Sequence, residues 1–387
     1  MRRLIPILGI TFVDIIGFSM LIPMLPYFVT HFGASAFVVG LLFATFSLCQ
    51  LLSAPLWGSV SDRIGRKFVL VTSQIGATIG WTMLAFAPNI GWVFVARIVE
   101  GVSGGNIGIT QAYVADLVAP KERARAFALI GATFGAGMVF GPVIGGVLFL
   151  KHGFAAPFLA AAALQLLTLL LTLVFVPESR RHEDRERVTL RQALALLRDP
   201  VLARALAQRL ALSLGLYGWY SVIALYLQRQ LGFALARTDF FFAAFAAVSV
   251  IMNAGAVGGV SRRTGDRRMS NIGLASLLAG FAMLAFVHSV SLLVVSMVLF
   301  AFGSALSQNG ITALISNAVN DREQGTVLGV GSSLDSLSGI VAPPISTGLL
   351  GGAGPSFAGL APSFFVLAAL VMGIVAARRE ARRTTPV

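Results

Sequence analysis

The chain has 387 residues, of which 57% are hydrophobic and only 12% are charged, and its mean hydropathy is +0.85. A soluble globular domain is about half apolar and about one quarter charged, so this composition excludes an ordinary soluble domain. The formal net charge is +13, but the basic residues lie in short segments between long apolar runs and form no patch typical of nucleic-acid binding.

Apolar runs follow one another along the chain. A helix that crosses about 30 Å of hydrocarbon needs roughly 20 apolar residues, because each residue adds about 1.5 Å. Twelve runs are long enough, so we predict an all-α integral membrane protein in which each helix satisfies its own backbone polar groups. The first run contains Asp14 and lacks a clear cleavage site, so we expect it to be retained. The predicted spans are 4–28, 36–60, 68–87, 90–115, 126–150, 154–176, 205–228, 239–260, 270–288, 290–316, 326–350 and 361–377.

The loops between these spans differ in charge. Basic residues are abundant in every second loop and at both termini, whereas the remaining loops hold only Lys151, Arg229 and Arg237. This asymmetry follows the positive-inside rule, so we expect both termini in the cytoplasm. The basic loops then face anionic lipid headgroups and not nucleic acid.

The chain divides into two similar halves. The longest polar segment, 177–200, predicts a cytoplasmic linker between a six-helix bundle at 1–176 and a second one at 201–387. Gly58, Arg63 and Gly65 recur as Gly258, Arg263 and Gly265, an offset of 200 residues. Shared order and offset indicate an internal duplication, which is common among transporters.

Four charges crowd into the turn between the second and third spans, GSVSDRIGRKFVL at 58–70. We expect Gly58 to allow two helices to approach closely, and Gly65 to take a positive φ in the turn. Asp62 can cap a helix or lie at the positive end of a neighbouring one, and Arg66 and Lys67 can pair with it. A loop that only sets orientation needs the basic residues but neither the glycines nor the aspartate.

This pattern, G-x-x-x-D-R-x-G-R-K, resembles the signature loop of the major facilitator superfamily, through Gly58, Asp62, Arg63, Gly65, Arg66 and Lys67. A second resemblance is Arg97-Ile-Val-Glu100-Gly101 in the fourth span. A third is GMVFGPVIGG in the fifth span, which looks like the motif of proton-driven drug antiporters, through Gly137, Gly141, Pro142, Gly145 and Gly146.

Further segments are similar to the tetracycline/proton antiporters and their multidrug relatives: Asp14 to Pro26, Ala112 to Asp116 and Pro177 to Ser179. The resemblance implies two six-helix bundles that rock around a midplane cavity in the bacterial inner membrane. It implies a small-molecule substrate, exchange with protons, and a monomer. Two positions depart from the pattern. The repeat loop has Arg262 in place of Asp62, and Gly80 stands where tetracycline exporters carry an acidic residue.

Ionisable residues inside a membrane span are costly, so each one is a candidate for function. Asp14 and Asp335 are expected about 15 Å from the inner ends of their helices, and Glu100 at a similar depth. Such carboxyl groups can take up and release protons, or can simply lock helices together. Arg97 lies one turn from Glu100, so the two can form a local salt bridge, or Arg97 can organise a proton relay or receive an anionic group of the substrate. Arg209 can act likewise, but we expect it to extend toward the inner interface.

Small and polar residues complete the prediction. Gly137, Gly141 and Gly145 form one smooth stripe, and we expect them to pack against Gly255 and Gly259 of the eighth span. Pro142 is expected to bend its helix. Candidates that line a substrate cavity are Gln50, Asn106, Gln111, Tyr217, Tyr220, Asn253, Ser304, Gln308 and Thr312.

Nucleotide, metal and cofactor motifs are missing from the sequence, which predicts no enzyme and no cofactor. The leading interpretation is a proton-coupled exporter of small amphipathic or hydrophobic compounds. Two alternatives stay open at this point: a facilitator or importer of a polar metabolite such as a sugar, and a membrane sensor or scaffold that does not transport.

Overall fold

The computed structural model describes residues 5–104, 110, 113–114, 123–178, 198–319 and 324–384. Within these ranges the regular structure is helical. The helices of the first half are α1 (Ile5–His31), α2 (Ala36–Ile64), α3 (Arg66–Ala85), α4 (Ile90–Ser103), α6 (Arg123–His152) and α7 (Ala155–Phe175). Those of the second half are α9 (Pro200–Leu231), α10 (Leu235–Thr264), α11 (Asp266–Met283), η3 (Leu284–Phe286), α12 (Val290–Asn317), α13 (Gln324–Ala353), η4 (Pro355–Phe357) and α14 (Leu360–Thr384).

Each predicted membrane span overlaps one α-helix of the described residues. In the described part of the chain, ten helices are long and apolar enough to cross a bilayer. The other two are α4, which is described for only 14 residues, and α13, whose 30 residues are rich in Gly, Ser and Pro. The predicted all-α membrane fold with twelve spans is therefore confirmed.

The chain forms two compact units. Unit 1 comprises Met1–Arg185 and Phe233–Ala247, and unit 2 comprises Glu186–Gly232 and Val248–Val387. The beginning of α10 thus belongs to unit 1. Most of the predicted linker at 177–200 lies outside the described residues, so the boundaries expected from the sequence stay a prediction.

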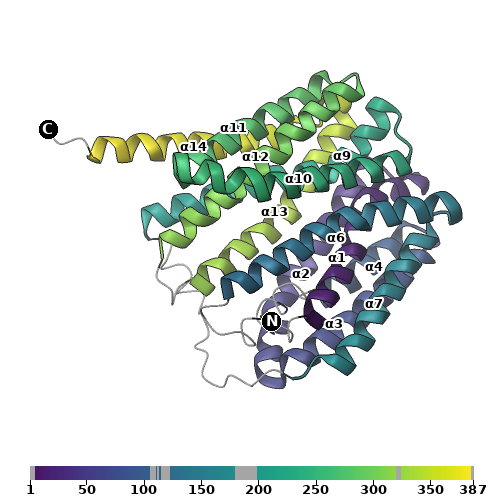
Figure 1. Ribbon diagram of the computed structural model, residues 1–387. Coiled ribbons are helices and arrows are strands. Elements are labelled where there is room, and N and C mark those ends of the chain that lie inside the picture. Colours follow the sequence, from purple (N-terminus) through teal and green to yellow (C-terminus); the bar gives the residue numbers. More distant parts are fainter. Residues whose placement is uncertain are drawn as a thin grey trace. The chain divides into compact units, whose positions relative to one another are not determined.

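Helix pairing inside each unit follows one scheme. In unit 1, α1 packs on α6 and α7, while α3 packs on α4 and α7. In unit 2, α9 packs on α13 and α14, while α11 packs on α12 and α14. Figure 1 shows α11, α12 and α14 side by side. The helices occupy the same order in both schemes, which supports the duplication expected from the sequence.

The glycine stripe of α6 packs on α1. A Cβ at Gly137 would lie 2.6 Å from Ile15 Cγ2, and one at Gly145 would lie 3.4 Å from Met20 Cγ. A Cβ at Gly141 would overlap Ser19, whose hydroxyl donates a 3.0 Å hydrogen bond to the Gly137 carbonyl. Small residues thus let two membrane helices approach closely.

The expected partner of this stripe belongs to the other unit. Gly255 and Gly259 of α10 lie in unit 2, so their packing against the stripe stays a prediction. Within unit 1, the close neighbour of the stripe is α1. α6 continues as a helix through Pro142, and the expected bend there stays a prediction.

Candidate functional site

The turn between α2 and α3 depends on Gly65. This residue has φ 126°, which strongly favours glycine, and its N–H donates to the Ser61 carbonyl over 3.1 Å. The expected positive φ is therefore confirmed. A Cβ at Gly65 would lie 2.5 Å from Glu178 Oε1 and 2.6 Å from Oε2, so the missing side chain also admits a carboxylate.

Glu178 is a residue of this turn that the sequence analysis did not assign to it. Its carboxylate accepts a 3.1 Å hydrogen bond from the backbone N–H of Lys67, at the first turn of α3. A carboxylate in this position is favoured by the positive end of the helix dipole. The Lys67 ammonium donates to the Leu173 carbonyl at the end of α7 over 2.8 Å. The turn is thereby tied to the end of α7.

Other members of the motif are described in part. A Cβ at Gly58 would meet no described atom within 4 Å, and the close helix approach expected there stays a prediction. Arg63 is exposed, and the Arg66 guanidinium donates to the Ser61 hydroxyl. The side chain of Asp62 lies outside the described residues, so its pairing with Arg66 and Lys67 stays a prediction.

The matching turn of unit 2 has the opposite charge at one position. Asp266 follows Gly265 as Arg66 follows Gly65, and Gly265 also has a positive φ of 76°. The Ser261 hydroxyl donates to Asp266 Oδ1 over 2.9 Å. A serine at the end of the preceding helix therefore bonds a cation in the first turn and an anion in the second.

A buried ion pair lies on α4. Arg97 Nη1 and Glu100 Oε2 are 2.6 Å apart, and the two side chains are only 4% and 7% exposed. Their i, i+3 spacing places them on one helix face, as expected. The Arg97 guanidinium also lies over the Phe46 ring of α2, with Cζ 4.5 Å from the ring centroid, which is a cation–π geometry.

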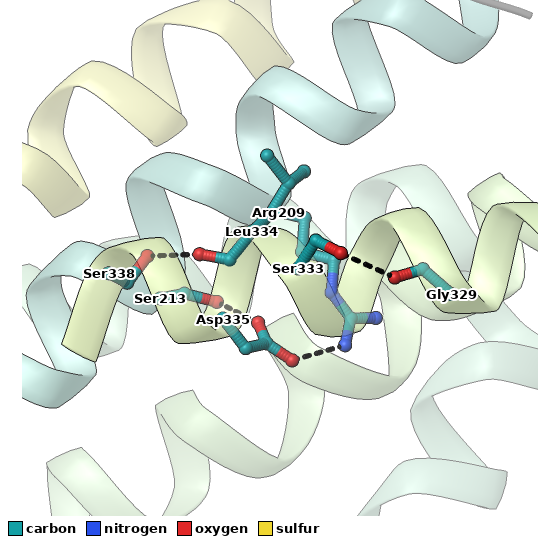
Figure 2. Close-up of polar contacts among 7 residues, drawn as sticks. All are labelled: Arg209, Ser213, Gly329, Ser333, Leu334, Asp335 and Ser338. Atoms are coloured by element: carbon teal, nitrogen blue, oxygen red, sulfur yellow. Dashed lines mark hydrogen bonds and ion pairs between the residues drawn. The ribbon is translucent and has the colours of Figure 1, made fainter. Parts of the chain in front are cut away.

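A second ion pair joins α9 to α13. Arg209 Nη2 donates to Asp335 Oδ2 over 2.7 Å, and the Ser213 hydroxyl donates to Oδ1 over 2.6 Å. Figure 2 shows the Asp335 carboxylate between these two donors. The side chains of Arg209 and Asp335 are 22% and 28% exposed, so this pair is more accessible than the pair on α4.

The expected extension of Arg209 toward the inner interface stays a prediction, while its guanidinium is bound by Asp335. A Cβ at Gly331 would lie 3.1 Å from Arg209 Cζ, so a glycine on α13 leaves room for the guanidinium. Tyr217 lies two turns beyond Arg209 on α9 and is 39% exposed. It stays a candidate for a cavity next to this pair.

The other cavity candidates differ in their exposure. Gln308, Thr312 and Asn253 are exposed, and Asn309, which the sequence analysis omitted, donates to Asn253 Oδ1 over 2.9 Å. Ser304 is buried and donates to the Ala301 carbonyl of its own helix over 3.1 Å, so its expected place in a cavity is wrong for this structure.

The contacts of the remaining site candidates do not show whether they line a cavity. Tyr220 packs edge-on against Trp219, with ring centroids 5.1 Å apart. Gln50 lies beside Gly104, where an added Cβ would be 3.3 Å from its Nε2. Asp14 is half-buried on α1, and its proton-carrying role stays a prediction. Asn106 and Gln111 lie outside the described residues.

The described residues contain no group of three or more His, Cys, Asp or Glu side chains that could hold a metal ion. They do contain an ion pair on α4 of unit 1 and another between α9 and α13 of unit 2, each next to a glycine that makes room for a charged group. Two related helical bundles with ionisable groups inside the membrane spans are typical of secondary transporters. The fold and the site therefore place this protein in that class.

Comparison with known proteins identifies the family. The model of the Major Facilitator Superfamily matches residues 7–343 and again 240–386, and the chain belongs to this family. It is 32% identical to the class C tetracycline resistance protein of Escherichia coli, over 98% of this chain and 97% of that protein. It is 27% identical to multidrug resistance protein 2 of Bacillus subtilis (strain 168), over 86% and 85%.

A solved structure confirms the fold. The crystal structure of the human organic anion transporter MFSD10 (TETRAN) has a TM-score of 0.73 and is 23% identical, over 96% of this chain and 99% of that one. The expected membership of the major facilitator superfamily, with resemblance to tetracycline and multidrug resistance proteins, is thus confirmed, and the protein is a multi-pass membrane transporter of small molecules.

Proposed function

We propose that this protein exports small amphipathic or hydrophobic compounds in exchange for protons, by alternating access. The observation that carries the proposal is the Arg209–Asp335 pair, with its 2.7 Å hydrogen bond and partial exposure. The relatives named for tetracycline and multidrug resistance support a substrate of this kind.

The chemistry of the pair suits proton exchange. A carboxylate next to a guanidinium inside a membrane bundle is stabilised by that cation and by the Ser213 hydroxyl. When the carboxyl group takes up a proton, the attraction to Arg209 is lost and the pair separates. Proton binding and pair formation therefore exclude one another, and water access to a partly exposed pair allows the proton to be exchanged.

The Arg97–Glu100 pair is proposed to serve the same cycle from unit 1. Its two side chains are almost completely buried, so it exchanges protons only when the bundle opens to water. Asp14 is proposed as a further proton carrier on α1. The basic loops support a location in the bacterial inner membrane with both termini in the cytoplasm.

A proteoliposome assay tests the proposal. Purified protein is reconstituted with a pH-sensitive dye inside the vesicles, and a panel of cationic and neutral amphipathic compounds is added. We expect a substrate-induced pH change for at least one compound. Substrate movement without a pH change would indicate a facilitator, and movement of neither would indicate a sensor or scaffold. Either result contradicts the proposal.

Two variants connect the assay to the pair. Asp335→Asn keeps the shape of the side chain but cannot carry the proton, so we expect at least a tenfold loss of the pH change. Ser333→Ala is the matched control, because Ser333 is exposed and its hydroxyl donates to the Gly329 carbonyl of its own helix, α13, over 3.2 Å. Equal loss in both variants would remove Asp335 from the mechanism.

A further inference from the structure

Asp239 is an acidic residue of α10 that none of the features above uses. It lies in the segment Phe233–Ala247, which belongs to unit 1. Its side chain is completely buried, at 0% exposure. Both carboxyl oxygens are buried and have no hydrogen-bond partner among the described residues. A buried carboxylate without a donor or a cation is strongly disfavoured, and protonation relieves this.

Two helices enclose this carboxyl group. On α6, Gly146 lies directly against it, since an added Cβ would be 2.9 Å from Asp239 Cβ and 3.0 Å from Oδ2. On α1, the Tyr27 hydroxyl donates to the Phe233 carbonyl over 2.7 Å. Tyr27 is also 2.7 Å from Thr238 Oγ1, and because its one hydrogen goes to Phe233, Thr238 is the donor. These bonds hold the start of α10 on α1.

Among the residues that the structure describes, the groups near Asp239 supply no compensating cation. From α1, the titratable group close enough to interact electrostatically is Tyr27, which is neutral and already bonded. From α6, the residue in contact is Gly146, which has no side chain. On α10 itself, Arg237 is exposed. Asp239 therefore differs from Glu100 and Asp335, each of which has an arginine partner.

We propose that Asp239 is a proton-binding site that couples protonation to the packing of the start of α10 on α1 and α6. The carboxyl group holds a proton while it is sealed against Gly146. When the start of α10 leaves these helices, water reaches the group and the proton dissociates. The released carboxylate then opposes resealing, so a lower pH favours the sealed form and a higher pH favours the open form.

This proposal rests on the proposed proton exchange, but its test needs no substrate. Spin labels are attached to Lys151→Cys and Arg237→Cys in the full-length protein carrying Cys49→Ser, since residues 151 and 237 are exposed at the adjacent ends of α6 and α10. Inter-label distances are measured in lipid nanodiscs between pH 5 and pH 9. We expect the short-distance population to fall as the pH rises.

Variants separate a proton site from a packing contact. Asp239→Asn stays neutral at every pH, so we expect it to remain sealed and to reduce the pH-dependent change in the sealed-to-open ratio at least tenfold. Thr238→Val is the matched control. It removes a hydroxyl from the neighbouring residue but keeps the acid, so the pH dependence persists. The same pH dependence in Asp239→Asn as in the parent, or none in the parent, overturns the proposal.

Gly146→Ala provides an independent measurement if Asp239→Asn does not fold. Its methyl group pushes on the sealed carboxyl group, so we expect a larger open population at each pH. An unchanged population contradicts the proposed contact. If the protein transports substrate in exchange for protons but the inter-label distances do not change with pH, only the Asp239 site is refuted. Distances that depend on Asp239 in a protein without proton-coupled transport would refute only the proposed function.

Discussion

Gly80 of α3 leaves the space that the Glu100 side chain of α4 occupies. A Cβ at residue 80 would overlap Glu100 Cγ and lie 3.1 Å from Cδ and 3.2 Å from Oε1. The carboxylate therefore enters the α3–α4 interface, where Arg97 holds it at 2.6 Å. The space beside Gly80 is thus filled by an acidic side chain from the neighbouring helix.

Substitution of Gly80 tests this complementarity. Gly80→Ala should lower the free energy of unfolding by about 1–3 kcal/mol, because the added methyl overpacks the interface. Thermal unfolding of the purified protein in detergent measures the effect. Gly58→Ala is the control, since a Cβ there meets no described atom within 4 Å and alanine favours a helix. In Gly80→Ala/Glu100→Ala the clash disappears, and stability should exceed that of Glu100→Ala alone.

Contacts between distant residues are the part of this site that the sequence did not reveal. Apolar runs of about 20 residues place each helix, because the bilayer fixes their length. Motif and spacing also predict that Arg97 lies beside Glu100 and that Gly65 has a positive φ, and the structure confirms both. The pairing of Arg209 with Asp335 depends on the packing of α9 on α13, and a single sequence does not specify such packing.

The same limit applies to other residues. The glycine stripe of α6 predicts a close helix neighbour, and the structure shows that α1 packs on it. Ser304 has the helical spacing of a cavity residue, yet its face is covered and its hydroxyl bonds its own helix. Asp239 lies in a run with Arg237 and three phenylalanines near a helix end, and no pattern of spacing indicates that it is sealed.

Glu178 should control how firmly the α2–α3 turn is held to the end of α7. Glu178→Gln keeps the size of the side chain but removes its charge, so the hydrogen bond from the Lys67 N–H weakens. We expect faster modification of a reporter Cys at the exposed position Arg63 by a water-soluble maleimide, by about threefold to tenfold, which corresponds to about 0.7–1.4 kcal/mol. The reporter is built in the Cys49→Ser background.

The control for this experiment is Asp199→Asn, which changes a carboxylate at the start of α9, far along the chain from the turn. Its modification rate should match that of the parent. A Glu178→Gln rate equal to the control rate would show that the carboxylate does not hold the turn.

Asp14 of α1 is a further carboxyl group proposed to carry protons. Asp14→Asn should leave the melting temperature nearly unchanged and abolish substrate accumulation driven by a pH gradient. Substrate exchange at equal pH on both sides should continue, because it requires no net proton movement. Thr11→Val is the control on the same helix, since the Thr11 hydroxyl bonds the Ile7 carbonyl over 2.8 Å. Unchanged gradient-driven accumulation in Asp14→Asn would remove Asp14 from the cycle.

The Arg97–Glu100 pair permits the sharpest separation of structure from function. Arg97→Ala leaves Glu100 as a buried carboxylate without its cation, and Glu100→Gln leaves a buried guanidinium. Each change should lower the free energy of unfolding by about 3–5 kcal/mol, as expected when one partner of a buried pair is removed. The double variant removes both charges, so its stability should return to within about 1 kcal/mol of the parent.

Transport by the same three variants then decides the role of the pair. If the pair belongs to the proton or substrate path, the double variant is stable but cannot couple substrate movement to a pH change. If the pair only joins helices, the double variant regains both stability and coupled transport. Thermal unfolding and the proteoliposome assay therefore have to be measured on the same preparations. We expect the double variant to regain stability but not coupled transport. The glycine at position 80 makes room for the Glu100 carboxylate, and two helices could pack against each other without such a buried charge.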